Sequence, residues 1–112
     1  MNFNVTEVKI IVTSPIENAE EIRQTLGNAG AGIIGNYSHC AISEKCTGTF
    51  KGNDNTNPYI GEKNVLEAVN EEKIEVKCDI KILKEVLKKL REVHLYEEPA
   101  IDIVPLINEK DI

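Results

Sequence analysis

One pattern occurs twice in this sequence: a stretch of alternating apolar residues leads directly into a stretch with helical spacing. Residues 5–13, VTEVKIIVT, and residues 72–79, EKIEVKCD, alternate as half-buried strands do. Each is followed by an apolar stripe that recurs every three or four residues, over 14–30 and over 79–93. Two such strand–helix units predict a sheet with both helices packed on one face.

Residues with clear capping preferences mark the starts of the two predicted helices. Ser14 can accept a hydrogen bond from the first turn, Pro15 suits the first helical position, and Glu17 completes a capping box. Asp79 is the predicted N-cap of the second helix. The glycines within 27–30 predict the end of the first helix.

The connecting segments predict the remaining elements. Short strands are expected at 37–42 and 47–50, with a hairpin tip at 43–45. A polar loop at 51–61, a short helical turn at 64–70, a last strand at 100–107 and a tail at 106–112 complete the prediction. We therefore expect an α+β, ferredoxin-like βαββαβ sandwich with an extra hairpin. The sheet face without helices is expected to be covered by self-association.

Composition narrows the possible functions. The chain has 112 residues, which is the size of one domain, and 19 acidic against 13 basic side chains give a net charge of −6. This charge disfavours binding to nucleic acid, and aromatic residues make up only 4% with no tryptophan for base stacking. Three cysteines without CxxC spacing and the lack of a membrane-length apolar run predict a cytoplasmic protein without disulfides or membrane contact.

Two clusters contain residues that can bind a cation. His94 is followed by Glu97 and Glu98, and an imidazole with carboxylates suits a divalent metal ion. His39 would join them if the fold or a subunit boundary brought it close. Alternatively, protonated His94 caps the end of the second helix, and His39 makes only a structural hydrogen bond. Cys40 adjoins His39, but neighbouring side chains of a strand diverge, which argues against a nucleophile–base pair.

Several segments resemble a known family. They are Gly35–Cys40, Gly48–Phe50, Asn57–Gly61, and His94–Ala100 with Asp102 and Pro105. In order and spacing these segments are similar to the PII/CutA-like inserted domain of the Nif-three-like family. The last one is also similar to the histidine–aromatic–acidic–proline segment of CutA proteins, although Leu95 stands where proline is expected.

The resemblance implies a homo-oligomeric module, expected to be a trimer, that binds ligands or has a regulatory role, with a divalent metal ion as its expected cofactor. Its predicted ligand-binding residues are Tyr37, Ser38, Asn57, Tyr59 and Tyr96. In full-length relatives, the chemistry named after GTP cyclohydrolase belongs to a flanking two-metal domain, so we expect a module without an activity of its own. The alternatives are a metal-dependent hydrolase of small nucleotide-like substrates and a docking module for a protein partner that carries the main family domain.

Overall fold

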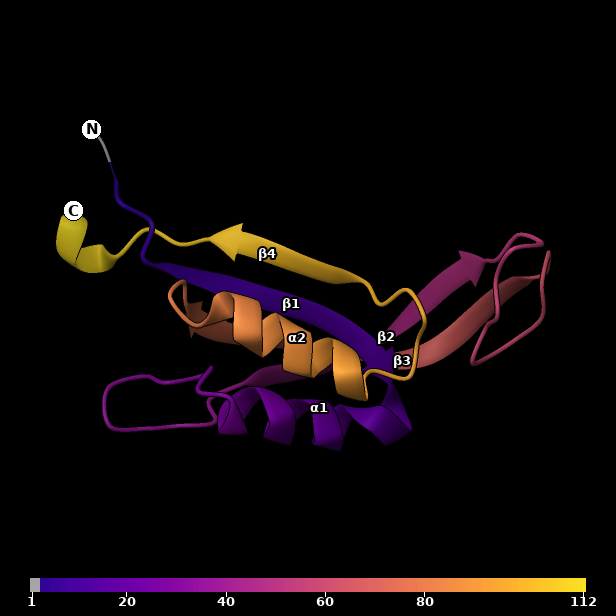
Figure 1. The fold of residues 1–112 in the computed structure, drawn as a ribbon, viewed down its shortest axis with the longest axis horizontal. Helices are drawn as coiled ribbons and strands as arrows, with labels where there is room; N and C mark the ends of the chain where they lie inside the picture. Colours follow the sequence, from indigo (N-terminus) through magenta and orange to yellow (C-terminus); the bar gives the residue numbers. More distant parts are fainter. Residues whose placement is uncertain (1–2) are drawn as a thin grey trace.

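The computed structural model describes residues 3–112. Figure 1 shows its two helices against a single sheet of four strands. The elements in chain order are β1 (Glu7–Pro15), α1 (Ile16–Asn28), β2 (Ile42–Lys51), β3 (Leu66–Asp79), α2 (Leu83–Val93), β4 (Ile101–Pro105) and a 3-10 helix η1 (Glu109–Asp111).

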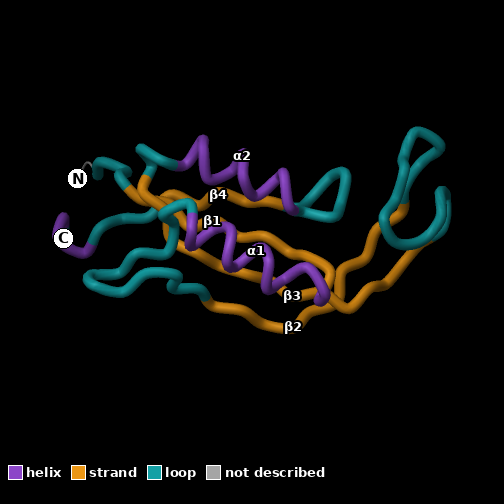
Figure 2. The backbone as a smooth tube through the Cα atoms, turned by 60° about the horizontal axis from the view of Figure 1, so that its bottom comes forward, coloured by secondary structure: helices purple, strands orange, loops and turns teal. Residues whose placement is uncertain are grey.

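The sheet is antiparallel throughout, with the strand order β2-β3-β1-β4. β1 lies inside the sheet, pairing with β3 along its whole length and with β4 on its other side. Both helices cover the same face, as Figure 2 shows. The predicted ferredoxin-like α+β fold is confirmed.

The core forms between this face and the helices, where the alternating residues of β1 and β3 meet the helical stripes. Ile10 and Ile74 from the sheet are fully enclosed, as are Ile22 of α1 and Leu90 of α2. Each such side chain contributes about 1.5–3 kcal/mol when it leaves water. The periodicity that predicted these four elements is therefore the pattern that closes the core.

Strands β2 and β3 continue beyond the end of β1 as a two-stranded ribbon. The last β1–β3 pair is Pro15 with Glu71, whereas β2 and β3 remain paired from Cys46 with Glu71 out to Lys51 with Leu66. We call residues 47–70, which are this ribbon and the loop joining its strands, the arm. It projects from the body in Figure 1 and contributes to the elongated shape, with extents of 48 × 30 × 24 Å.

The arm corrects several sequence predictions. Residues 42–51 form one continuous strand, so the predicted tip at 43–45 lies inside β2. Residues 66–70 are strand and form no helical turn, because they pair with 47–51. The strand predicted at 37–42 is a loop before Ile42, and its His39 has a left-handed φ of 58° that a strand cannot contain.

Both helix starts also differ from the predictions. Ser14 belongs to strand β1, and its hydroxyl donates to the Pro15 carbonyl at 3.0 Å. The N-cap of α1 is therefore Pro15, and no capping box forms. Asp79 accepts from the Lys81 N–H at 2.8 Å in a turn that precedes α2. The predicted tail includes a short 3-10 helix at Glu109–Asp111.

The two ends of the fold lie side by side. The N–H of Leu106, just after β4, donates to the carbonyl of Glu7, the first residue of β1, at 3.1 Å. Figure 1 shows the start of β1 and the C end of the chain at the same end of the molecule, opposite the arm. Within residues 3–112, no helix has both the length and the apolar character that crossing a bilayer requires.

Candidate functional site

A pocket of about 400 Å³ lies where the arm leaves the body. Its walls come from the outer half of β2, the loop after it, Glu71 of β3, and the segment 96–100 between α2 and β4. Three parts of the chain that are far apart in sequence therefore meet here. This convergence, with mixed apolar and polar walls, is typical of a ligand-binding site.

Tyr96 and Glu71 form the buried polar contact of the pocket. The Tyr96 hydroxyl donates to Oε2 of Glu71 at 2.6 Å, and Glu71 is only 4% exposed. Burial and the hydrogen bond to this carboxylate raise the pKa of Tyr96 well above its usual value. The phenol therefore stays protonated and acts as a donor to a carboxylate enclosed by the protein.

Two further aromatic rings surround Tyr96. The ring centroid of Phe50 in β2 is 6.1 Å from that of Tyr96, and the centroid of Tyr59 in the loop is 6.5 Å away. Both rings are inclined to Tyr96, at 58° and 57°, so they form an angled wall rather than a stack. The Tyr59 hydroxyl donates to Oε1 of Glu17 at 3.2 Å, and this bond raises the pKa of Tyr59.

The segment after His94 also holds the loop of the arm. Oε1 of Glu97 accepts a hydrogen bond from the backbone N–H of Asn57 at 2.8 Å. Glu97 and Glu98 are both exposed and line the pocket with Tyr59. Of the predicted ligand-binding residues, Tyr59 and Tyr96 therefore line one site, while Asn57 contacts its wall through its backbone.

His94 ties the segment 96–100 to β1. Its Nε2 donates to the carbonyl of Thr13 in β1 at 2.8 Å, and its Nδ1 accepts from the N–H of Tyr96 at 3.1 Å. Burial lowers the pKa of His94, so the ring is neutral in this arrangement. Both ring nitrogens already have protein partners, and the ring bonds to β1 rather than capping the carbonyls of α2.

His39 lies at the other end of α1 from His94. Its Nε2 is 2.9 Å from Oδ1 of Asn28, and its Nδ1 is 2.9 Å from the hydroxyl of Ser38. The ring also covers Gly27, where an added Cβ would collide with it. Tyr37 next to this contact is 76% exposed. The structure thus places the predicted residues 37–39 away from the pocket.

The four predicted metal ligands do not come together within one chain. His94 contacts β1 near the start of α1, whereas His39 contacts the end of that helix. Among residues 3–112, no three side chains of the His, Cys, Asp or Glu types are grouped so as to hold a metal ion. Glu97 and Glu98 are the two members of the predicted set that line the pocket.

Sequence reasoning missed the partner of Tyr96. Glu71 alternates in step with Lys73 and Glu75, so the sequence pattern alone does not single it out. In the fold it pairs with Pro15 and Cys46 and accepts from Tyr96, and it is buried there. Phe50 carried a signal, because it belongs to the segment Gly48–Phe50 quoted for the family resemblance, but its role in the wall was not predicted.

Comparisons with known proteins agree with this fold. No family model matches the sequence. The protein from Halalkalibacterium halodurans named GTP cyclohydrolase 1 type 2 homolog is 46% identical over 101 residues, which are 90% of this chain and 27% of that protein. Its counterpart from Bacillus subtilis is 45% identical over 98 residues, 88% of this chain and 26% of that protein. The chain thus spans about a quarter of the length of the curated relatives it matches.

Solved structures give the same result. The Bacillus cereus protein related to NIF3 superposes with a TM-score of 0.78 and 40% identity, over 96% of this chain and 27% of that one. The periplasmic divalent cation tolerance protein CutA from Archaeoglobus fulgidus has a TM-score of 0.66 at 22% identity, covering 89% of this chain and 83% of that one. The similarity to CutA shows the fold alone, whereas the protein related to NIF3 is similar in both fold and sequence. Over nearly all of this chain, sequence and fold therefore match one segment of proteins related to NIF3, and the fold is also that of CutA.

Proposed function

We propose that this chain is a ligand-binding, regulatory module of the Nif-three-like and CutA-like type, and that the pocket around Tyr96 is its binding site. The observation that carries the proposal is the enclosed hydrogen bond from Tyr96 to Glu71 in the wall of a pocket of about 400 Å³. Side chains that only stabilise a fold rarely place a buried carboxylate beside a cavity, because burial of the charge is costly.

The proposal assigns the module no reaction of its own. A metal-dependent hydrolase, the alternative, requires about three convergent ligands with an open position, and the part of the chain described here groups no such set. The curated relatives are about four times longer than the matched segment, which supports a module that works beside a larger partner domain. Ligand binding at the pocket would then affect the partner domain by changing the position of the arm or its docking to that domain.

Self-assembly is part of the proposal. One face of the sheet has no helix over it, and β2 is an edge strand of ten residues with open backbone groups. A homotrimer would cover this face and pair or shield this edge. Light scattering coupled to gel filtration tests the point, and a monomer at all concentrations up to about 1 mM contradicts it.

A divalent cation is the second candidate ligand, since the Archaeoglobus neighbour is named for divalent cation tolerance. Within one chain it would find carboxylates of Glu71, Glu97 and Glu98 at the pocket, and the remaining ligands would come from another subunit. Titration calorimetry with Mg²⁺, Mn²⁺ and Zn²⁺ tests it. Affinity that is unchanged in a Glu97→Gln/Glu98→Gln variant would place the cation elsewhere.

The pocket itself is tested by blocking it. A Cβ at Gly48 would collide with the Glu71 carboxylate. Gly48→Val therefore places a side chain in the pocket wall and displaces the carboxylate. Ala68→Val adds a similar side chain to the neighbouring strand of the arm, at a residue that does not line the pocket. A chemically mixed library is screened by backbone amide NMR against the wild-type chain.

We expect hits whose shifts centre on Tyr96 and Phe50, lost in Gly48→Val and retained in Ala68→Val. A library that gives no shifts at these residues, or hits that survive Gly48→Val in a folded protein, contradicts the proposed site.

A further inference from the structure

We infer that the pocket at the base of the arm takes an organic cation: a small molecule with an ammonium or guanidinium head and a short apolar body. This inference rests on the proposed function, because it names the ligand class of the same site. Three observations carry it: the charge of the walls, the state of Glu71, and the aromatic rings around the cavity.

The walls are strongly negative. They contain four carboxylates, of Glu62, Glu71, Glu97 and Glu98, and one ammonium group, of Lys51. No ion pair within residues 3–112 involves any of these five side chains. A cavity lined by one excess sign concentrates field lines and attracts ligands of the opposite charge. The walls therefore disfavour phosphates and carboxylates as ligands.

Glu71 is the group that a cation would reach at depth. The residue is only 4% exposed, and its one side-chain hydrogen bond among residues 3–112 comes from Tyr96 to Oε2. Oε1 packs over Gly48 in the pocket wall and keeps some exposure, since no fully enclosed side-chain oxygen of the described residues lacks a partner. An ammonium or guanidinium N–H donated to Oε1 would supply the charge partner that the protein leaves out.

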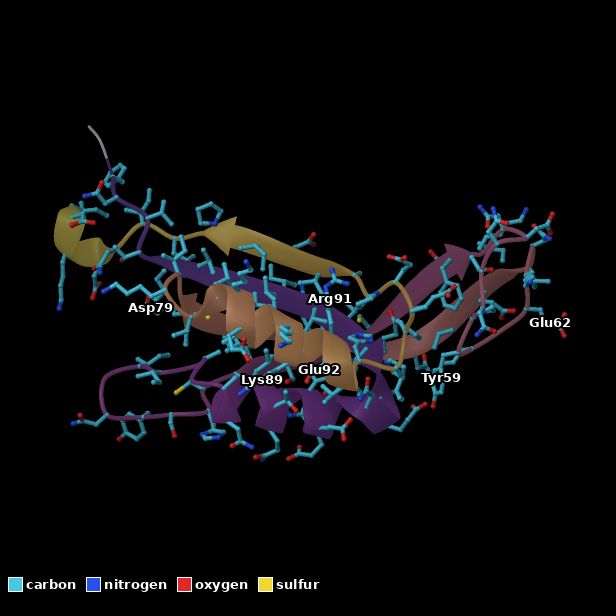
Figure 3. All side chains as sticks on the ribbon, viewed as in Figure 1. Tyr59, Glu62, Asp79, Lys89, Arg91 and Glu92 are labelled. Carbon is cyan, nitrogen blue, oxygen red and sulfur yellow. The ribbon has the colours of Figure 1, made fainter. Side chains whose placement is uncertain are left out.

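The rings supply the second half of the recognition. The ring centroids of Phe50 and Tyr59 lie 6.1 and 6.5 Å from that of Tyr96, and both rings are inclined to Tyr96 by 57–58°, so neither stacks on it. Inclined aromatic faces attract an organic cation through their quadrupoles and also hold its apolar part. Figure 3 shows Tyr59 near the base of the arm, on the side facing the helices.

The same walls fit an organic cation better than a bare metal ion. Aromatic rings offer a metal ion no lone pairs, and the described residues group no three ligands around one point. They also fit it better than a neutral ligand, which would leave Glu71 without a charge partner. The apolar body of the ligand accounts for a cavity of about 400 Å³, which is far larger than a hydrated ammonium requires.

The test uses probes of one shape and different charge: benzylammonium, benzylguanidinium, benzyl alcohol and phenylacetate, with MgCl₂ as the metal alone. Affinities are measured on the wild-type chain by amide NMR shifts of Tyr96 and Phe50. We expect the two cations to bind at least tenfold more tightly than benzyl alcohol, and phenylacetate to bind most weakly. The site also predicts that tyrosine fluorescence changes with the cations, in a chain that has no tryptophan.

The variants separate recognition from general charge. Glu71→Gln keeps an oxygen for the Tyr96 hydroxyl and removes the charge, so we expect the preference for cations to fall about tenfold. Glu92→Gln removes the same charge from the exposed face of α2, as labelled in Figure 3, and should leave the preference unchanged. Phe50→Leu, which removes a ring and keeps bulk, should weaken both cations more than benzyl alcohol.

Equal binding of benzylammonium and benzyl alcohol, or equal losses in Glu71→Gln and Glu92→Gln, overturns the inference. If Glu71→Gln does not fold, the wild-type probe series and Phe50→Leu decide it. Should the cations fail while another library compound binds at Tyr96, the ligand class is wrong and the proposed site stands. Absence of every ligand from the pocket removes both.

Discussion

The hydroxyl of Tyr96 donates at 2.6 Å to a carboxylate 25 positions earlier in the chain, that of Glu71. This bond ties the segment between α2 and β4 to the strand at which the arm begins. Both residues also line the pocket that we propose as the binding site. Stability and the proposed ligand binding can therefore be probed separately at this pair.

Removing the phenol should destabilise the fold. In Tyr96→Phe the buried Glu71 loses its donor, and we expect the free energy of unfolding to fall by about 1–3 kcal/mol. Tyr59→Phe is the matched control, because its hydrogen bond to Glu17 lies at the surface and should matter by less than about 0.5 kcal/mol. Urea unfolding followed by circular dichroism measures both, and equal losses would contradict a special role for the Tyr96–Glu71 bond.

His94 should make stability depend on pH. Burial holds its pKa below the ordinary 6.5 in the folded chain, so just below pH 6.5 the unfolded chain binds more protons. The free energy of unfolding therefore falls as the pH drops from about 6.5 towards the lowered pKa of His94. Above pH 6.5, His94 causes no such loss of stability.

The measurement is the free energy of unfolding at pH 7.5 and 5.5. His94→Gln should lose less stability than wild type between these values, although it starts lower. An NMR titration of His94 that gives a pKa at or above 6.5 would falsify the argument.

The contact of His39 with Gly27 predicts a reversal of sign. Gly27→Ala in a helix ordinarily gains up to about 1 kcal/mol, but here the new methyl collides with the His39 ring. We expect Gly27→Ala alone to be neutral or destabilising, and the same change in a His39→Ala background to stabilise. A double-mutant cycle from urea unfolding measures this coupling, and additive effects would show that the ring moves aside freely.

Hydrogen exchange should differ along β3. Residues 71–75 pair on both sides, with β1 and β2, whereas residues 66–70 pair with β2 alone. The amides of 66–70 should therefore exchange faster in dilute solution. If a trimer covers the arm, their protection should rise with protein concentration while that of 71–75 stays constant. Equal protection in a confirmed monomer would contradict this reading of the arm.

The elements predicted well are those whose pattern arises from burial. β1, α1, α2 and residues 72–79 of β3 each place one face in the core, so their apolar residues recur with the period of their structure. β2 is an edge strand whose residues are mostly exposed, and its sequence ISEKCTGTFK contains no alternation to detect. Residues 66–70 become strand because β2 pairs with them, which is a tertiary effect.

The candidate site follows the same division. Tyr59 and Tyr96 were predicted from segments that resemble a family, and Glu97 and Glu98 were predicted as metal ligands beside His94. All four line the pocket. His39 and His94 were paired by residue type alone, and the fold gives each its own local partners. Glu71 had no sequence signal, since its burial depends on where β1 stops and which loop crosses there.

The adjacency of Glu7 and Leu106 bears on how such a module can be carried within larger proteins. A unit whose entry and exit strands are neighbours can be spliced between two residues of a host without pulling the flanking chain apart. The arm and its pocket are then held at the far end, clear of the junction. The site of insertion into a host protein and the proposed binding pocket thus lie at opposite ends of the module. Either can change in sequence without altering the other.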